Sequence, residues 1–315
     1  METTYGIISD IHAVHPQRVI DAITILTQRL GVNGLIFNGD LIGELSGFNS
    51  RDYLATVLKT AVDTGVEVYA QEGSHESVIL SRPVFNYFSL KYENFTDACR
   101  TPVVDGDGHR LIFLPGADWH AVNPQQGKYM IDEVHSRDSG FYQTEDGPVR
   151  LTNIVDIAKY TQDPQRTIVV SHIPRAFDGS IETAVDMAYF AERADKSLMS
   201  GVVVENMIRQ KVNGPLTDAD IPLIAAQNGF TMKREHRGNE KLRAAFEQAG
   251  ITKAINGHFH ESAHRAHDRQ CQPLPEGQYH DELFWMASYA DAGKYGVLRV
   301  NDEGKVSYLN VKLGA

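Results

Sequence analysis

The sequence predicts an α/β fold in which strands and helices alternate along the first hundred residues. Apolar runs at 5–9, 34–38 and 67–70 have the length and composition of buried strands. The segments between them carry apolar residues at helical spacing, and the unit repeats about every 30 residues. This is the βαβ pattern of a parallel sheet covered by helices. Polar residues that follow such strands meet at one edge of the sheet, where open α/β folds place their chemistry.

The two predicted helices have recognisable ends. The first begins at Pro16 and ends at Gly31, and the second begins at the capping residue Ser50 and ends at Gly65. Each has one apolar face, which predicts that it packs against the sheet. The apolar positions are Val19, Ile20, Ile23, Leu26 and Leu30 in the first helix, and Tyr53, Leu54, Val57, Leu58, Ala61 and Val62 in the second.

The pattern changes after residue 100. Two apolar runs, 103–104 and 110–114, flank an Asp-Gly-Asp-Gly turn, which predicts a β-hairpin and the start of a second sheet. Residues 119–150 have the composition of loops. The fully apolar run 167–171 is a further strand of the buried kind.

Residues 176–237 differ from the rest of the chain. Between 183 and 212 the apolar residues follow a long helical pattern, which Pro215, Pro222 and Gly229 interrupt. We interpret 176–237 as a helical insertion, either a cap or a dimer surface, within a single domain that spans 1–315. The insertion ends in basic residues, which we interpret as a solvated face rather than a phosphate-binding site. They are Lys233, Arg234, His236 and Arg237.

The last third of the chain returns to regular elements. A helix is expected over 239–249, ending at Gly250, and a strand over 251–255. Apolar runs at 283–287, 296–300 and 305–311, with a turn at 301–304, predict antiparallel sheet.

Composition restricts the class of protein. The chain has 315 residues, of which 42% are hydrophobic, and a net charge of −11. This charge argues against a broad nucleic-acid surface, since such surfaces are usually basic. Cys99 and Cys271 are far apart and are expected to be buried free thiols. No signal peptide or apolar stretch of membrane length is evident, so we expect a cytoplasmic protein with no membrane contact.

Metal-binding residue types follow five of the apolar runs. Carboxylates and imidazoles that converge from strand ends are costly to bury unless they hold a metal ion. Asp40 has two oxygens and is therefore the natural residue to bridge two ions. The five motifs are Asp10-Ile11-His12, Gly39-Asp40, Gly73-Ser74-His75-Glu76, Ser171-His172 and Gly257-His258-Phe259-His260.

In this order, the motifs resemble those of the calcineurin-like metallophosphoesterase superfamily. The resemblance covers residues 5–260. It implies a four-layer αββα sandwich of two mixed β-sheets flanked by helices. It also implies two divalent transition metal ions, of which manganese is the first expectation and iron, zinc or nickel are alternatives, in keeping with mixed imidazole and carboxylate ligands.

The resemblance assigns a role to each of these positions. Asp10, His12 and His260 are implied ligands of one metal, and Asp40 is the implied bridge. His172 and His258 are the implied ligands of the second metal. His75 takes the position of the catalytic histidine, which stabilises the transition state and protonates the leaving group. A hydroxide shared by the two ions is the implied nucleophile.

One position departs from the family pattern. Ser74 stands where the family has an asparagine whose amide oxygen binds the second metal. The serine hydroxyl has a shorter reach, so the second metal is expected to be the weaker one.

Three further residues near the motifs have open roles. Glu76 either orients an imidazole or favours the start of a helix. Asn38 is interpreted as a turn residue. His120, which follows the 110–114 strand, is a weaker candidate for the lining of the site.

Together these features predict a phosphoesterase that hydrolyses a phosphomonoester or a small phosphodiester such as a nucleotide. The net charge and the insertion at 176–237 favour a small substrate, and the same insertion is a candidate surface for homo-oligomers. Two alternatives remain. One is a nuclease, which would require a basic groove for which 233–237 is the only candidate. The other is a binding scaffold that has lost activity, for which Ser74 is the sole support.

Overall fold

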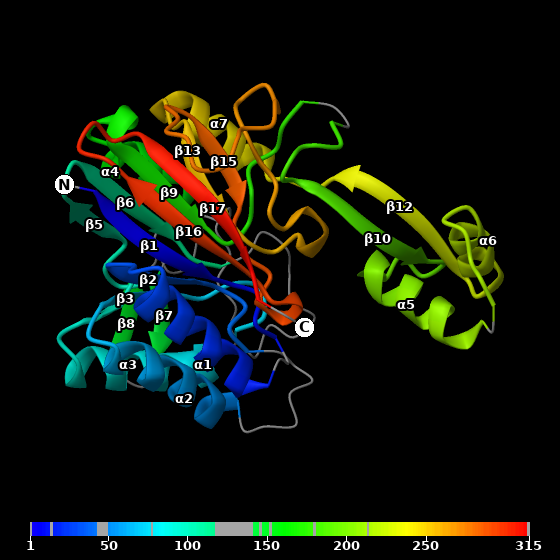
Figure 1. The fold of residues 1–315 in the computed structure, drawn as a ribbon, viewed down its shortest axis with the longest axis horizontal. Coiled ribbons are helices and arrows are strands. Elements are labelled where there is room, and N and C mark those ends of the chain that lie inside the picture. The colour runs from blue at the N-terminus through cyan, green and yellow to red at the C-terminus, as the bar shows by residue number, and fades with distance from the viewer. Residues whose placement is uncertain are drawn as a thin grey trace.

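Two mixed β-sheets pack face to face, and helices cover the outer face of each sheet (Figure 1). The computed structural model describes residues 2–12, 15–42, 50–76, 78–116, 141–144, 147–150, 153–178, 181–212 and 214–313. The arrangement confirms the predicted αββα sandwich. Within the described residues, no helix is long and apolar enough to span a membrane.

The first sheet has six strands in the order β17-β16-β1-β2-β3-β4. Strands β1 to β4 are parallel to one another, and β16 and β17 extend the sheet as an antiparallel hairpin beside β1. The parallel part confirms the predicted βαβ units. The strands are β1 (Thr3–Ile8), β2 (Gly34–Asn38), β3 (Glu67–Gln71), β4 (Phe95–Asp97), β16 (Lys294–Val300) and β17 (Val306–Lys312).

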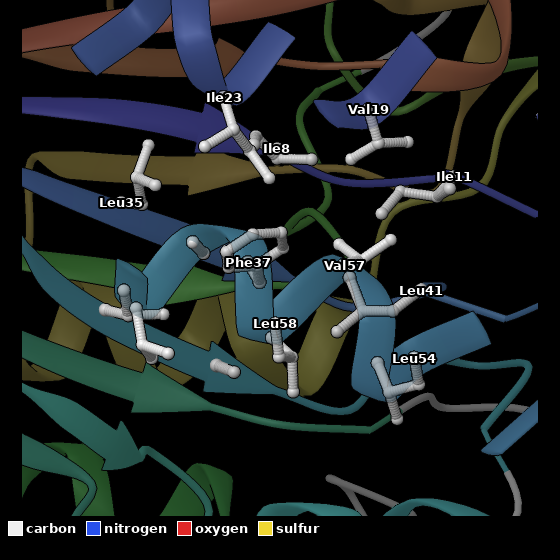
Figure 2. Packing of buried hydrophobic residues seen from close by; sticks show 14 of the residues in the cluster. Ile8, Ile11, Val19, Ile23, Leu35, Phe37, Leu41, Leu54, Val57 and Leu58 are labelled. Carbon is white, nitrogen blue, oxygen red and sulfur yellow. The ribbon is translucent and has the colours of Figure 1, made fainter. Parts of the chain in front are cut away.

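Three helices cover this sheet. They are α1 (Pro16–Thr24), which continues as a π-helical segment (Ile25–Arg29), α2 (Ser50–Asp63) and α3 (Val78–Lys91). Figure 2 shows how the apolar stripes of α1 and α2 meet side chains of the sheet. In β2, Leu35 and Phe37 face these helices while Ile36 faces the other sheet, which explains why the run is continuously apolar.

The second sheet has six strands in the order β14-β15-β13-β9-β6-β5. We predicted antiparallel sheet at 283–287, where the structure has β15. This prediction is wrong in part, because β15 pairs in parallel with β13 and is antiparallel only to the short strand β14. The strands are β5 (Val103–Gly106), β6 (His109–Leu114), β9 (Thr167–Ser171), β13 (Lys253–Asn256), β14 (Ala266–His267) and β15 (Leu283–Met286).

Two helices, α4 (Ile157–Tyr160) and α7 (Glu240–Ala249), cover the second sheet. The Asn239 side chain caps α7 by accepting from the Leu242 N–H at 2.7 Å, and Gly250 ends it with φ of 69°. Between the sheets lies a core that includes Tyr5, Phe113 and Trp285. Both cysteines are buried and free, as predicted.

The shorter elements connect these layers. A hairpin lies within 119–150, which we predicted to be loop-like, and His120 falls outside the described residues. These elements are β7 (Phe141–Thr144), β8 (Gly147–Arg150) and the 3-10 turns Ile154–Asp156, Pro164–Arg166, His260–Ser262 and Ala290–Ala292.

The insertion forms an arm that projects away from the body of the molecule (Figure 1). The prediction that it is helical is wrong in part. Its two long strands, β10 and β12, pair antiparallel along their full length, and helices α5 and α6 pack on them around a small core of their own. The arm consists of β10 (Met187–Arg193), β11 (Leu198–Ser200), α5 (Gly201–Lys211), α6 (Asp220–Gln227) and β12 (Phe230–His236). Its role as a cap or dimer surface stays a prediction.

The base of the arm is tied to the second sheet by His267, which is fully buried. The Nδ1–H of His267 donates to the Asp268 carbonyl at 2.7 Å, and Nε2 accepts from the Val185 N–H at 3.0 Å. Both contacts require the neutral ring, because a protonated Nε2 could not accept from Val185. Burial accordingly lowers the pKa of His267 to about 4.

Acid should therefore destabilise the protein through His267. The unfolded imidazole gains a proton near pH 6.5 and the folded one only near pH 4, so stability is lost as the pH falls through this window. At ~1.4 kcal/mol per pKa unit the loss is about 3 kcal/mol. Between pH 7 and pH 4, the free energy of unfolding measured with urea should fall by about 3 kcal/mol less in His267→Gln than in the wild type. The variant His280→Gln, at a partly exposed position, serves as the control, and equal pH dependence in all three proteins would contradict the assignment.

Candidate metal centre

The loops that follow strands of both sheets meet at one end of the sandwich. Asp10 and His12 follow β1, Asp40 follows β2, and Ser74 and His75 follow β3 of the first sheet. The second sheet supplies His172 after β9, and His258 and His260 after β13. The carboxyl ends of the parallel strands thus deliver all eight residues singled out in the sequence to one region.

The first donor set consists of Asp10, His12 and His260, whose ligand atoms all lie within 4.8 Å of one another. His260 Nε2 is 3.2 Å from Asp10 Oδ1 and 3.0 Å from His12 Nε2. Asp10 is fully buried and its Oδ2 accepts from the Ser9 hydroxyl at 2.6 Å, which fixes the carboxylate. These three are the residues that the resemblance assigned to one metal.

The second donor set consists of Asp40, His172 and His258, again within 4.8 Å. His172 Nε2 lies 3.1 Å from Asp40 Oδ2. The Nδ1–H of His172 donates to the Asn38 carbonyl at 2.9 Å, which directs Nε2 toward Asp40. Backbone hydrogen bonds of this kind orient histidine ligands in metal sites.

A third set, of His12, Asp40 and His75, joins the other two. His75 Nε2 is 4.0 Å and His12 Nε2 is 3.9 Å from Asp40 Oδ2. The rings of His12 and His75 meet edge to face, with centroids 4.8 Å apart. Asp40 therefore belongs to two sets. His12 also belongs to two, and it links Asp40 to the set that contains Asp10 and His260. The resemblance assigned His75 a catalytic role rather than a place among the metal ligands.

Ser74 reaches the second donor set. Its hydroxyl lies 3.1 and 2.9 Å from the two Asp40 carboxylate oxygens and 3.4 Å from His258 Nδ1. The oxygen is therefore placed among the predicted ligands of the second metal. In this conformation the hydroxyl donates to Asp40.

Charge states in the centre suit metal binding. Burial would raise the pKa of Asp40, but the charges of His172 and His75 hold it well below its usual range. Burial lowers the pKa of His12 to about 4 and that of His258 to about 3, so both rings are neutral near pH 7. Burial acts likewise on His172, but the Asp40 charge outweighs it and raises the pKa to about 10. A metal ion at the second set must displace that proton.

The backbone of the centre is held in sparsely populated conformations. Asp10, His12, Asp40 and His258 have φ of 54°, 47°, 52° and 75°. Positive φ is uncommon outside glycine and clusters at functional sites. Gly39 has φ of 78°, and a Cβ there would lie 2.6 Å from Gly73 Cα and 2.7 Å from His172 Nδ1. The loops after β2 and β3 can approach this closely only because position 39 is glycine.

Glu76 holds these two loops together. Its buried carboxylate accepts four backbone N–H groups, those of Gly73, Asp40, Leu41 and Ile42, with the first two at 2.6 and 3.0 Å. Burial raises the pKa of Glu76 to about 7, and the Asp40 charge adds to this effect. Because all four partners are donors, we expect the ionised form in the folded protein. The imidazole-orienting role that we predicted for Glu76 is wrong, since its carboxylate binds backbone N–H groups, and the role at a helix start stays a prediction.

Removing this carboxylate should strongly destabilise the protein. Glu76→Ala leaves four buried N–H groups without a partner, and each one costs about 1–3 kcal/mol. We expect the free energy of unfolding of the metal-free protein to fall by at least about 4 kcal/mol. Glu67→Ala, at an exposed position at the start of β3, should change it by no more than about 0.5 kcal/mol. A loss below about 1 kcal/mol for Glu76→Ala in urea unfolding would show that water replaces the carboxylate.

A buried ion-pair network supports the end of β3. Arg82 on α3 donates from Nε to Glu72 at 2.8 Å and from Nη1 to Asp97 at 2.6 Å. Glu72 directly precedes the Gly73-Ser74-His75-Glu76 loop, and all three charged residues are buried. Arg82 therefore anchors the ends of β3 and β4 to α3.

Sequence reasoning missed several neighbours of the centre. Asn38, predicted as a turn residue, is the last residue of β2 and its side chain donates to the Ser171 carbonyl at 3.2 Å, which links the two sheets. Tyr289 stacks on His260, with ring centroids 4.0 Å apart and planes at 10°. No motif marks Tyr289, since it comes from a loop near the end of the chain.

Comparison with known proteins supports the fold alone. No family model and no curated protein matches the chain. A protein of Thermus thermophilus, TT1561, has a similar crystal structure, with a TM-score of 0.53 and 8% identity over 99% of this chain and 100% of that one. A second solved structure matches with a TM-score of 0.51 and 10% identity over the full length of both chains. At this identity the likeness shows a shared architecture for the whole chain and nothing of its chemistry.

Proposed function

We propose that this protein is a metal-dependent phosphoesterase of the calcineurin-like type, which hydrolyses a phosphomonoester or a small phosphodiester. The observation that carries the proposal is the position of Asp40, whose Oδ2 lies 3.1 Å from His172 Nε2 in one donor set and 3.9 Å from His12 Nε2, a member of the set with Asp10 and His260. A single structural site would need only one set, whereas two ions that share a carboxylate suit phosphoryl transfer.

The residues present fit two divalent ions. The sets combine carboxylate oxygens with imidazole nitrogens, which suit manganese, iron, zinc or nickel better than calcium or magnesium. His172 is fully buried, and its Nε2 lies 3.1 Å from Asp40 Oδ2. A buried imidazole and a buried carboxylate in contact are donor types that transition metals bind, which supports a ligand role. When bound, two such ions activate a water molecule and neutralise charge on the phosphoryl group.

His75 supplies the proton in this proposal. Its side chain is 32% exposed, whereas that of His172 is fully buried, so a substrate can approach His75 from solvent. The backbone N–H of His75 donates to Asp40 Oδ1 at 2.8 Å, which holds the residue beside the centre. The protonated ring can stabilise charge on the phosphoryl group and then pass its proton to the leaving oxygen.

The nuclease alternative gains no support from Lys233 and Arg237 of the basic cluster. They lie on the arm, where Lys233 pairs with Glu192 at 2.8 Å and the guanidinium of Arg237 covers the Phe190 ring.

A metal-reconstitution assay tests the proposal. The protein is stripped with a chelator, reloaded with Mn²⁺, Zn²⁺, Ni²⁺ or Mg²⁺, and assayed on phosphomonoesters, cyclic and linear diesters and short oligonucleotides. We expect no hydrolysis by the stripped protein and full recovery with Mn²⁺ on small esters. Failure to hydrolyse every ester while holding two ions per chain would contradict the proposal and favour a binding scaffold.

A further inference from the structure

A cavity of about 270 Å³ lies where the arm joins the body. Its walls come from β10, α5 and β12 of the arm and from the segment that carries His260. Glu261, the next residue after His260, lines the cavity, and its Oε1 lies 3.5 Å from the Ser200 hydroxyl at the start of α5. The cavity therefore adjoins the segment that supplies His260 to the metal centre.

Two arginines face this cavity, and neither is neutralised. Arg234 lies over the Tyr189 ring at 4.7 Å from its centroid. Arg265 donates to the carbonyls of Glu182 and Ala184 rather than to a carboxylate. Within the described part of the chain, neither guanidinium forms an ion pair. Burial lowers the pKa of Arg265 and the charge of Arg234 lowers it further, while the charges of Glu182 and Glu261 raise it.

Three carboxylates also line the cavity, and among the described residues none of them forms an ion pair with Arg234 or Arg265. Glu205 is held by Arg209 through two hydrogen bonds of 2.9 and 2.6 Å, and it accepts from the Tyr189 hydroxyl at 3.3 Å. Glu182 and Glu261 also line the cavity, but among the described residues neither lies within 4.0 Å of an arginine nitrogen as an ion pair. Two guanidinium groups that line one cavity without a carboxylate hydrogen-bonded to either can bind an anion, because arginine binds phosphate and carboxylate through paired hydrogen bonds.

We infer that this cavity is a subsite for a second anionic group, phosphate or carboxylate, on the leaving group of the substrate. Arg234 and Arg265 bind the anion, and Tyr189 supports the guanidinium of Arg234. At ~30 Å³ per water molecule the cavity holds roughly nine waters, which is room for such a group together with bound water. The inference rests on the proposed phosphoesterase activity, and it adds that the substrates are esters whose leaving group carries a phosphate or a carboxylate.

Matched esters test this subsite. The Mn²⁺-loaded protein is assayed on the monophosphates of ethane-1,2-diol, butane-1,4-diol and hexane-1,6-diol, and on the same diols carrying a second phosphate or a terminal carboxylate. We expect at least one dianionic series to be favoured in kcat/KM by about 10-fold or more, because hydrogen bonds to charged groups are strong. Comparing the two series identifies which anion is preferred.

Arg234→Gln should remove this preference. Arg237→Gln is the matched control, because it removes an arginine that also covers an aromatic ring of the same arm but does not line the cavity. An unchanged preference in Arg234→Gln, or none in the wild type, overturns the subsite while the phosphoesterase proposal stands.

A binding measurement separates the two proposals. If no ester is hydrolysed, calorimetry with butane-1,4-diol bisphosphate on the Mn²⁺-loaded proteins gives an independent readout. Affinity that falls at least about 10-fold in Arg234→Gln but not in Arg237→Gln supports the anion subsite without the activity. Equal affinity in both variants, or no binding to the wild type, overturns it.

Discussion

Asp40→Asn should empty both metal sites together and abolish hydrolysis. Asp40 is a member of two donor sets, and its carboxylate lies 3.1 Å from His172 Nε2 and 3.9 Å from His12 Nε2. The amide keeps the shape of the side chain but loses the charge that two cations would share. Changes beside a metal ligand commonly lower affinity about 10–100-fold, and loss of a shared ligand should exceed that for both ions.

Asp10→Asn is the matched control for this experiment. Asp10 belongs only to the set with His12 and His260, so this variant should lose one ion and retain the other. The metal content of both variants is measured by mass spectrometry after dialysis against a weak chelator. Retention of one full equivalent by Asp40→Asn would show that Asp40 does not bridge.

His75→Asn should have the second large effect, and the effect should depend on the leaving group. A general acid contributes about 10²–10⁴-fold when the leaving group needs a proton. Alkyl esters, whose leaving groups are poor, should therefore lose that much in kcat, whereas activated aryl esters should lose far less. Metal content should stay the same, because His75 Nε2 lies 4.0 Å from Asp40 and each of the other two donor sets is complete without it.

His12→Asn provides the contrast. His12 belongs to two donor sets, so its loss should lower metal content and reduce the rate on alkyl and aryl esters alike. If His75→Asn behaves in this way, His75 is a metal ligand and not the acid. The two variants therefore distinguish the two roles that the third donor set leaves open for His75.

The site residues could be predicted because each one lies in the loop that follows an apolar run. In β2, the run Gly34–Asn38 is buried on both faces, so its end was visible in the sequence, and Asp40 comes two residues later. The same holds for β1, β3 and β9. The partners within each donor set depend on loops of two sheets coming together, and the resemblance to a family supplied them rather than the spacing.

The arm shows where local patterns failed. Ala188 and Ala191 are spaced as on a helix, but they lie in β10, which pairs with β12 about 40 residues later in the chain. Because the paired residues are far apart in the chain, no local sequence pattern indicates the pairing. Helix α3 was also missed, because Pro83 lies inside it and proline usually ends a helix. The four backbone contacts of Glu76 likewise depend on folded loops.

The most direct test of the dinuclear centre is anomalous scattering from crystals of the protein loaded with Mn²⁺. We predict two manganese peaks about 3.5–4 Å apart, one beside Asp10, His12 and His260, the other beside His172 and His258, with Asp40 bound to both. A single peak, or two peaks of which only one contacts Asp40, would contradict the account.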